Sequence, residues 1–225
     1  MTHHDSINDF EMAELNTFPK ILQFNAQQWP HETAMREKEF GIWNEFTWED
    51  YNNRVKWLTL ALLDKGVNKG DAIALLGDNR PEWVWGEVAA HAMRCHSLGI
   101  YQDSMHDEVA YLLQSSHATV VIAEDEEQCD KLLELGDEIS HVKFIVYCDP
   151  RGMRKYNDER LIDVNSLYTL GQTIDNSEPN RYPQLIEATS PDDIAIYCPT
   201  SGTTSKPKIA LLNGGNFVKH CSSYL

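Results

Sequence analysis

The sequence predicts an α/β fold in which a mostly parallel sheet is flanked by helices. The main observation is that short, almost wholly apolar runs of strand length recur along the chain, at 72–76, 119–123, 144–147 and 194–198. Segments with apolar residues at helical spacing lie between the first three runs. Strands that alternate with helices form βαβ units, and their crossovers make neighbouring strands parallel with right-handed connections.

The first elements follow from local signals. Residues 1–15 are polar and are expected to form a flexible N-terminus. Thr17-Phe18-Pro19 predicts the start of a helix, because proline suits a first turn. Thr47 and Asp50 have capping-box spacing, and Lys65-Gly66 marks the end of the helix that follows. The apolar positions of that helix recur at helical spacing, at Tyr51, Val55, Leu58 and Leu62.

Three further helices are predicted between the strands. Asn79 is expected to cap a helix that has Pro81 in its first turn. Ser104 and Asp107 repeat the capping pattern ahead of a second helix, and the third covers 126–135. Arg80, between Asn79 and Pro81, is expected to pair with Glu82 or with a helix end.

The last third of the chain is predicted to leave the sheet for the surface and then to return to it as a strand. Residues 149–180 contain few apolar side chains and are expected to form a surface excursion. The run 194–198 is predicted to be a central strand. The polar segment that follows would then leave the carboxyl end of that strand, where ligands of open α/β sheets usually bind.

Composition narrows the functional classes. The chain has 225 residues, a formal net charge of −16 and a mean hydropathy of −0.46. An acidic surface argues against nucleic acid or anionic lipid as partners. No apolar run has the length of a transmembrane segment, and the N-terminus does not resemble a signal peptide, so a cytoplasmic location is expected.

The five cysteines include no C-x-x-C pair and are interpreted as reduced thiols, with Cys198 as a small packing residue. His91 and His96 are five residues apart, which disfavours a shared metal site on one helix.

The segment after residue 198 is rich in groups that bind phosphate. Hydroxyls donate hydrogen bonds, a glycine permits close backbone approach, lysines supply positive charge, and Pro207 stiffens the end of the loop. The spacing matches neither the Walker pattern nor the dinucleotide fingerprint, and by composition alone a surface loop remains an alternative. The candidate phosphate-binding residues are Thr200, Ser201, Gly202, Thr203, Thr204, Ser205, Lys206 and Lys208.

The order of these residues, Thr-Ser-Gly-Thr-Thr-x-x-Pro-Lys, resembles the phosphate-binding signature of the AMP-forming acyl and aryl ligases. Segments upstream are similar to the N-terminal part of bacterial long-chain fatty acyl-CoA synthetases, and the resemblance extends over about residues 15–225. Those segments are Gly41-Ile42-Trp43, Thr47-Trp48, Gly70-Asp71, Asn79-Arg80-Pro81-Glu82-Trp83, Gly99-Ile100-Tyr101 and Ala123-Glu124-Asp125-Glu126-Glu127-Gln128.

Two positions of the signature depart from the family pattern. The family usually has glycine where Ser205 and Ile209 stand, and Ser205 is interpreted as a feature of a bacterial branch. Ser and Ile resist positive φ, so the backbone there differs or does not need that geometry. Further on, Asn213-Gly214-Gly215-Asn216 replaces the family's frequent Thr-His-x-Asn.

The resemblance implies ATP-dependent activation of a long-chain fatty acid to an acyl-adenylate, followed by transfer to CoA. It implies ATP and Mg²⁺ as cofactors, CoA as co-substrate, and Thr200 as a contact of Mg²⁺. Residues 16–225 would be the N-terminal portion of the AMP-binding domain. The catalytic residues would lie beyond Leu225, so that this chain alone is expected to be inactive.

Other interpretations stay open at this point. The chain could be a non-catalytic truncated relative that acts as a binding or interaction protein. It could instead belong to an enzyme that adenylates an aryl or amino acid. Self-association into a homo-oligomer and a peripheral association with the membrane are further hypotheses.

Overall fold

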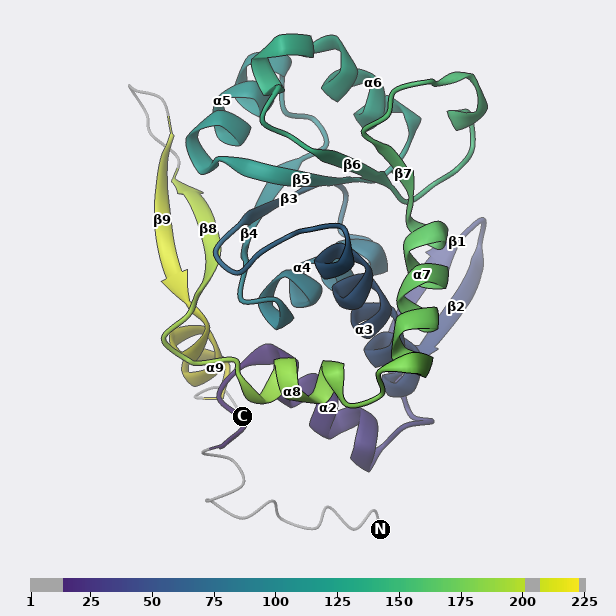
Figure 1. Cartoon of the computed structure of the whole chain (residues 1–225), viewed down its shortest axis with the longest axis vertical. Helices are drawn as coiled ribbons and strands as arrows, with labels where there is room; N and C mark the ends of the chain where they lie inside the picture. Colours follow the sequence, from purple (N-terminus) through teal and green to yellow (C-terminus); the bar gives the residue numbers. More distant parts are fainter. Residues whose placement is uncertain (1–13, 201–206, 223–225) are drawn as a thin grey trace.

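The computed structural model describes residues 14–200 and 207–222, and its centre is a seven-stranded sheet (Figure 1). The strands are β3 (Ala72–Gly77), β4 (His96–Tyr101), β5 (Ala118–Ala123), β6 (Phe144–Tyr147), β7 (Leu161–Asp163), β8 (Ile194–Thr200) and β9 (Lys208–Asn213). Their order is β7-β6-β5-β3-β4-β8-β9, and every pairing is parallel except that of β8 with β9. The predicted α/β class with a mostly parallel sheet is confirmed.

Helices cover both faces of the sheet. On one face lie α2 (Phe18–Gln28), α3 (Trp48–Asp64), α4 (Pro81–Ala92), α7 (Val164–Ser177) and α8 (Arg181–Glu187). On the other face lie α5 (His106–Ser116), α6 (Glu126–Glu134) and the short 3₁₀ turn Gly136–Ile139 (Figure 1). A further 3₁₀ turn covers Met153–Lys155, and α9 (Gly214–Ser222) follows β9.

The alternation of side chains along β3 shows how the sheet divides the core. Ile73 and Leu75 point to the side of α3 and α4, whereas Ala74 and Leu76 join the cluster under α5 and α6. All six residues of β3 are buried. A strand covered on both faces reads as a continuous apolar run, which is why the sequence located it so clearly.

Local capping signals place α2 and α3 where the sequence predicts them. Thr17 is the N-cap of α2, with proline in the first turn. At α3 the capping box is complete: Thr47 Oγ1 accepts a hydrogen bond from the Asp50 N–H at 3.1 Å, and Asp50 Oδ2 accepts one from the Thr47 N–H at 3.0 Å. Gly66 follows the helix at φ +90°, a conformation that glycine adopts without strain.

Two predicted N-caps are wrong by one residue. The N-cap of α4 is Arg80, not Asn79, because the residue before Pro81 is held in an extended conformation and the helix cannot begin earlier. The N-cap of α5 is Met105, not Ser104, and its side chain makes no capping hydrogen bond. Acidic residues in the first turn of both helices complement the helix dipole.

The prediction that 149–180 is a surface excursion is wrong for its second half. This segment contains edge strand β7 and helix α7, and α7 packs along α3. Gly171 permits this approach, since a Cβ there would lie 1.9 Å from the carbonyl oxygen of Trp57. The buried side chains of α7 do recur at helical spacing, at Val164, Leu167, Tyr168 and Ile174, so the sequence carried a signal for this helix that was not recognised.

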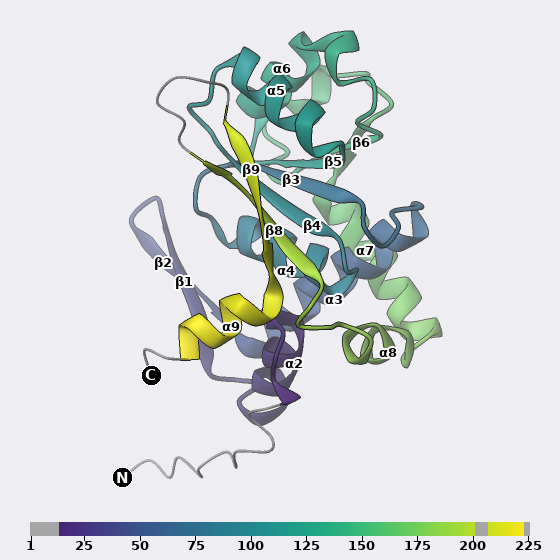
Figure 2. The same ribbon diagram turned by 90° about the vertical axis from the view of Figure 1, so that its left-hand side faces the viewer.

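Strand β4 in the middle of the sheet and two features at its margins were not predicted from the sequence. The hairpin β1 (Thr33–Glu39) and β2 (Ile42–Thr47) stands apart from the main sheet, and β9 adds an antiparallel edge strand (Figure 2). Consequently β8 is not a central strand, because it lies next to the edge and most of its residues are only half-buried. Within the described ranges, no helix is long and apolar enough to cross a membrane.

Candidate active site

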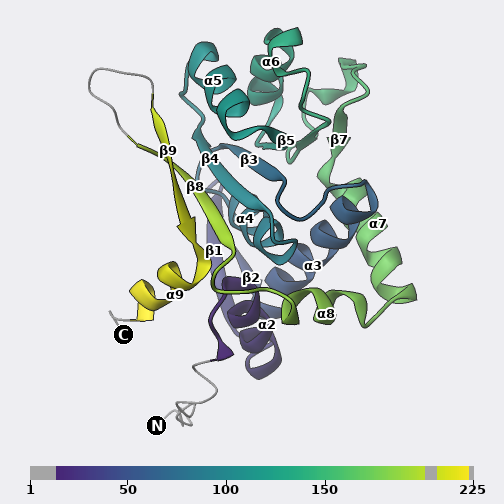
Figure 3. The same cartoon turned by 60° about the vertical axis from the view of Figure 1, so that its left-hand side comes forward.

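The candidate phosphate loop connects two strands that run side by side. Figures 2 and 3 show β8 and β9 side by side. Strand β8 ends at Thr200 and β9 begins at Lys208, and these two residues face each other in the antiparallel register. The Thr200 hydroxyl donates to the Lys208 carbonyl oxygen at 3.1 Å. The remaining predicted phosphate-binding residues lie outside the described residues, namely Ser201, Gly202, Thr203, Thr204, Ser205 and Lys206.

Helix α5 holds the second end of this hairpin connection. The Tyr111 hydroxyl, on α5, donates to the Pro207 carbonyl oxygen at 2.7 Å. Tyr111 is 96 residues away in the sequence, and no motif singled it out. The contact ties the start of β9 to the helix that follows β4, and so fixes where the candidate loop returns to the sheet.

The opposite end of β8 is anchored by side chains from β4 and the turn before it. His96 Nδ1 donates to the Ile194 carbonyl oxygen at 2.7 Å, and its ring stacks on Tyr197 with centroids 4.7 Å apart. Arg94 binds Asp193 through two hydrogen bonds of 2.8 Å. Burial alone would raise the pKa of Asp193, but hydrogen bonds from Arg94 and from a backbone N–H lower it overall. These contacts hold the start of β8 against β4 and the turn before it.

Several tempting residues have structural partners. His91 is buried and its Nε2 lies 3.1 Å from the Ser97 hydroxyl, while His96 is engaged with β8, so the two rings do not converge. Cys198 is exposed, so its prediction as a packing residue is wrong. Successive side chains of a strand point to opposite faces, and β8 is only partly covered, so Cys198 lies on its exposed face.

The donor set near Thr200 fits a metal ion that is held mostly by other ligands. The Thr200 hydroxyl donates its hydrogen to the backbone carbonyl oxygen of Lys208, so the lone pairs of the hydroxyl oxygen remain available for a cation. In the part of the chain that the structure describes, no three His, Cys, Asp or Glu side chains gather to hold a metal. Mg²⁺ commonly keeps several waters and is bound through substrate phosphates, and one protein hydroxyl suits that mode.

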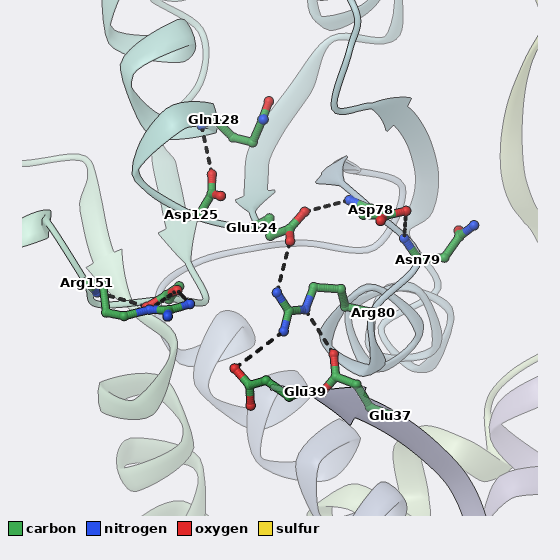
Figure 4. Close-up of polar contacts among 10 residues, drawn as sticks. Glu37, Glu39, Asp78, Asn79, Arg80, Glu124, Asp125, Gln128 and Arg151 are labelled. Carbon is green, nitrogen blue, oxygen red and sulfur yellow. Dashed lines mark hydrogen bonds and ion pairs between the residues drawn. The ribbon is translucent and has the colours of Figure 1, made fainter. Parts of the chain in front are cut away.

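A second polar group lies at the carboxyl ends of β3 and β5 (Figure 4). Arg80 donates to Glu37 at 3.0 Å and to Glu124 at 3.1 Å, and its third nitrogen lies 3.9 Å from Glu39. Glu124 also accepts from the Asp78 N–H at 2.7 Å. These carboxylates help to hold Arg80 as a cation, raising its pKa, although burial acts in the opposite direction.

This arrangement corrects the expectation that Arg80 pairs with Glu82. Its partners come instead from β1 and from the residue after β5, so Arg80 joins the hairpin to the sheet. The spacing of Glu37 and Glu39 on one face of a strand was the available signal. It was not recognised because the hairpin itself was not predicted.

Comparison with known proteins supports the same fold and family. A family model described as "AMP-binding enzyme" matches residues 22–225. A long-chain-fatty-acid–CoA ligase of Xenopus laevis is 24% identical over 218 residues, which cover 93% of this chain. The chain spans only 28% of that relative's length.

Solved structures of low sequence identity share the fold. Acetoacetyl-CoA synthetase from Streptomyces lividans superposes with a TM-score of 0.75 at 18% identity, covering 92% of this chain and 32% of that protein. An anthranilate CoA ligase in complex with anthranoyl-AMP superposes with a TM-score of 0.72 at 21% identity, covering 89% of this chain and 35% of that protein. Because the family model extends over most of the sequence, the chain belongs to the AMP-binding enzyme family.

Proposed function

We propose that this chain supplies the phosphate-binding part of an AMP-forming acid–thiol ligase that activates a long-chain fatty acid. The observation that carries the proposal is the signature Thr200–Lys208, which connects the carboxyl end of β8 to β9. The names of relatives such as the Xenopus laevis ligase support the fatty acid as substrate. The chain spans only about a quarter of the length of these relatives. We therefore propose the complete ligase reaction for a longer protein that contains this chain, and phosphate binding for the chain itself.

The first step of such a reaction brings two anions together. A fatty carboxylate attacks the α-phosphate of ATP and releases pyrophosphate, and the CoA thiol then displaces AMP to form the thioester. A step of this type depends on charge neutralisation and on in-line positioning. In this proposal the hydroxyl and backbone donors of 201–205 bind the β- and γ-phosphates. Lys206 and Lys208 supply positive charge, and Thr200 contacts Mg²⁺.

These cations act against the field of the whole molecule. The formal net charge of −16 disfavours the approach of ATP and CoA at long range. Screening by salt limits this repulsion to roughly 10 Å. Contacts within the loop must therefore supply the affinity, and mutations in the loop are the direct test of the proposal.

The test measures binding of MgATP to the full 225-residue chain by titration calorimetry. Lys206→Ala and Gly202→Val are each expected to weaken binding by about tenfold or more, because each removes a phosphate contact or blocks close approach. Lys65→Ala, which removes an exposed charge after α3, is the matched control. Equal affinity in all four proteins would refute the assignment of the loop.

The acid substrate needs a separate measurement. A longer protein that contains this chain is expected to catalyse ATP–pyrophosphate exchange with palmitate in preference to benzoate or alanine. Preference for benzoate or alanine would replace the fatty acid by an aryl or amino acid. We expect no exchange by the 225-residue chain alone, and measurable exchange with palmitate would contradict that expectation.

A further inference from the structure

A cavity of about 220 Å³ opens at the carboxyl ends of three parallel strands. Gly77, Glu124 and Cys148 line it at or directly after the ends of β3, β5 and β6. The chain passes from β3 to β4 on one side and then to β5 on the other, so the strand order reverses between β3 and β5. Ligands of open α/β sheets bind outside the carboxyl ends of the strands at such a reversal. β4 separates this place from β8, and none of the described lining residues belongs to β8 or β9.

The walls on the sheet side are apolar. Leu75, Leu76 and Ile122 line the cavity and are almost completely buried in the core. Trp83 lines it from α4, and its ring covers Gly99, where a Cβ would lie 2.8 Å from a ring carbon. This packing fixes the indole in place. The cavity thus offers a pre-formed apolar surface, smaller than that of a typical drug-sized site.

The rim of the cavity is acidic. Six carboxylates line it against two guanidinium groups, so the site carries four surplus negative charges. Both guanidinium groups are already paired, Arg80 with Glu37 and Glu124, and Arg151 with Asp149. Among the described lining residues no cation is left to receive a phosphate or a carboxylate. The cavity therefore does not suit ATP, CoA or a fatty acid.

Of the six lining carboxylates, Asp78 and Glu82 belong to no ion pair among the described residues. Asp78 is exposed and accepts a hydrogen bond from the Asn79 N–H, so the more buried carboxylate without a counter-ion is Glu82. It is half-buried on the first turn of α4, and within the described ranges no ion pair includes it. The charges of Arg80 and Arg54 act on it only from a longer distance. A carboxylate beside apolar walls is stabilised by a donor that brings its own positive charge. No described cluster of acidic side chains has the arrangement of a metal site, which points to an organic cation.

We propose that this cavity binds a small organic amine, with its protonated nitrogen at Glu82 and its apolar body against Leu75, Ile122 and Trp83. The site is separate from the phosphate loop and does not depend on the proposed ligase reaction. A short arylalkylamine has the required combination of one positive charge and one compact apolar group. In this proposal Glu82 binds the ammonium group, and the apolar wall contacts the hydrocarbon part of the amine.

The experiment titrates the full 225-residue chain with phenethylamine by calorimetry, at neutral pH and low salt. The probe is compared with 2-phenylethanol and with phenylacetate, which keep the apolar body but are neutral or negative. We expect a dissociation constant on the order of 1 mM for the amine, and at least about tenfold weaker binding of the other two. Glu82→Gln, which keeps the size of the side chain, is expected to weaken binding of the amine by about tenfold.

Controls separate this site from general charge attraction. Glu138→Gln removes one exposed carboxylate from the 3₁₀ turn after α6 and is expected to leave amine binding unchanged. Thermal unfolding verifies that each variant is folded. Equal binding of amine and alcohol, no binding of the amine, or equal effects of Glu82→Gln and Glu138→Gln would each overturn the proposal. Binding of MgATP is measured in the same samples, so loss of one site is distinguishable from loss of the other.

Discussion

Replacing Arg80 by glutamine tests whether the hairpin is held by charge. The guanidinium lies 3.0 Å from a carboxylate oxygen of Glu37 and 3.1 Å from one of Glu124. The side chains of Arg80, Glu37 and Glu124 are 32%, 17% and 15% exposed, so their ion pairs are intermediate between exposed and buried ion pairs. Exposed ion pairs contribute about 0.2–1 kcal/mol, whereas removing one partner of a buried pair costs about 3–5 kcal/mol. We therefore expect Arg80→Gln to lower the free energy of unfolding by about 2–3 kcal/mol.

The assay is urea unfolding, followed by tryptophan fluorescence and by circular dichroism. With a slope of about 2 kcal/mol/M, the midpoint of Arg80→Gln should fall by about 1–1.5 M without a change in slope. The variant leaves three carboxylates facing one another without their cation. Added salt should therefore recover part of its lost stability relative to wild type, because it screens this repulsion.

The matched control is Arg36→Gln on the same hairpin. Arg36 pairs with Glu45 at 2.9 Å, but both side chains are more than half exposed. Its loss is expected to cost less than about 1 kcal/mol. If Arg80→Gln costs no more than Arg36→Gln, or if salt does not narrow its difference from wild type, the reasoning about this cluster is wrong.

Three further predictions concern stability and use the same urea assay. Gly171→Ala should cost about 3 kcal/mol or more, because its Cβ would lie 1.9 Å from the Trp57 carbonyl oxygen, whereas exposed Gln172→Ala on the same helix should be nearly neutral. Burial lowers the pKa of His91 to about 4 from an unfolded value of 6.5, so the unfolded state takes up the proton first as pH falls. The free energy of unfolding should then decrease by up to about 3 kcal/mol between pH 6.5 and 4. The His91→Gln variant should lack this part of the decrease. If the stabilities of wild type and variant change in parallel with pH, this account of His91 is wrong. Thr47→Ala removes the capping box of α3 and should cost about 1 kcal/mol, and no loss would mean that the box contributes nothing to stability.

Features encoded by adjacent residues were the ones that the sequence predicted correctly. The capping box of Thr47 and Asp50 and the proline in the first turn of α2 need only near neighbours. The run 72–76 was recognised because a strand buried on both faces requires apolar residues at every position. Each of these signals acts within a few residues and does not depend on the rest of the fold.

Features that depend on distant partners were missed. Strand β9 exists because it pairs with β8, and its half-exposed residues have no strong pattern of their own. Helix α7 is a different case, because its buried residues have helical spacing in the sequence and only their burial depends on packing against α3. The role of Tyr111 depends on a contact 96 residues away.

By itself, the sequence determined the α/β class, most helices, four of the seven strands of the sheet (β3, β5, β6 and β8) and the order of residues in Thr200–Lys208 that identifies the family resemblance. Only the tertiary structure decided that β8 lies near an edge and that Arg80 binds three carboxylates. It alone located the acidic cavity between β3 and β5. The physical reason is range: capping, proline restriction and burial patterns act along the chain, whereas ion pairs, strand order and cavities depend on which distant residues the fold brings together.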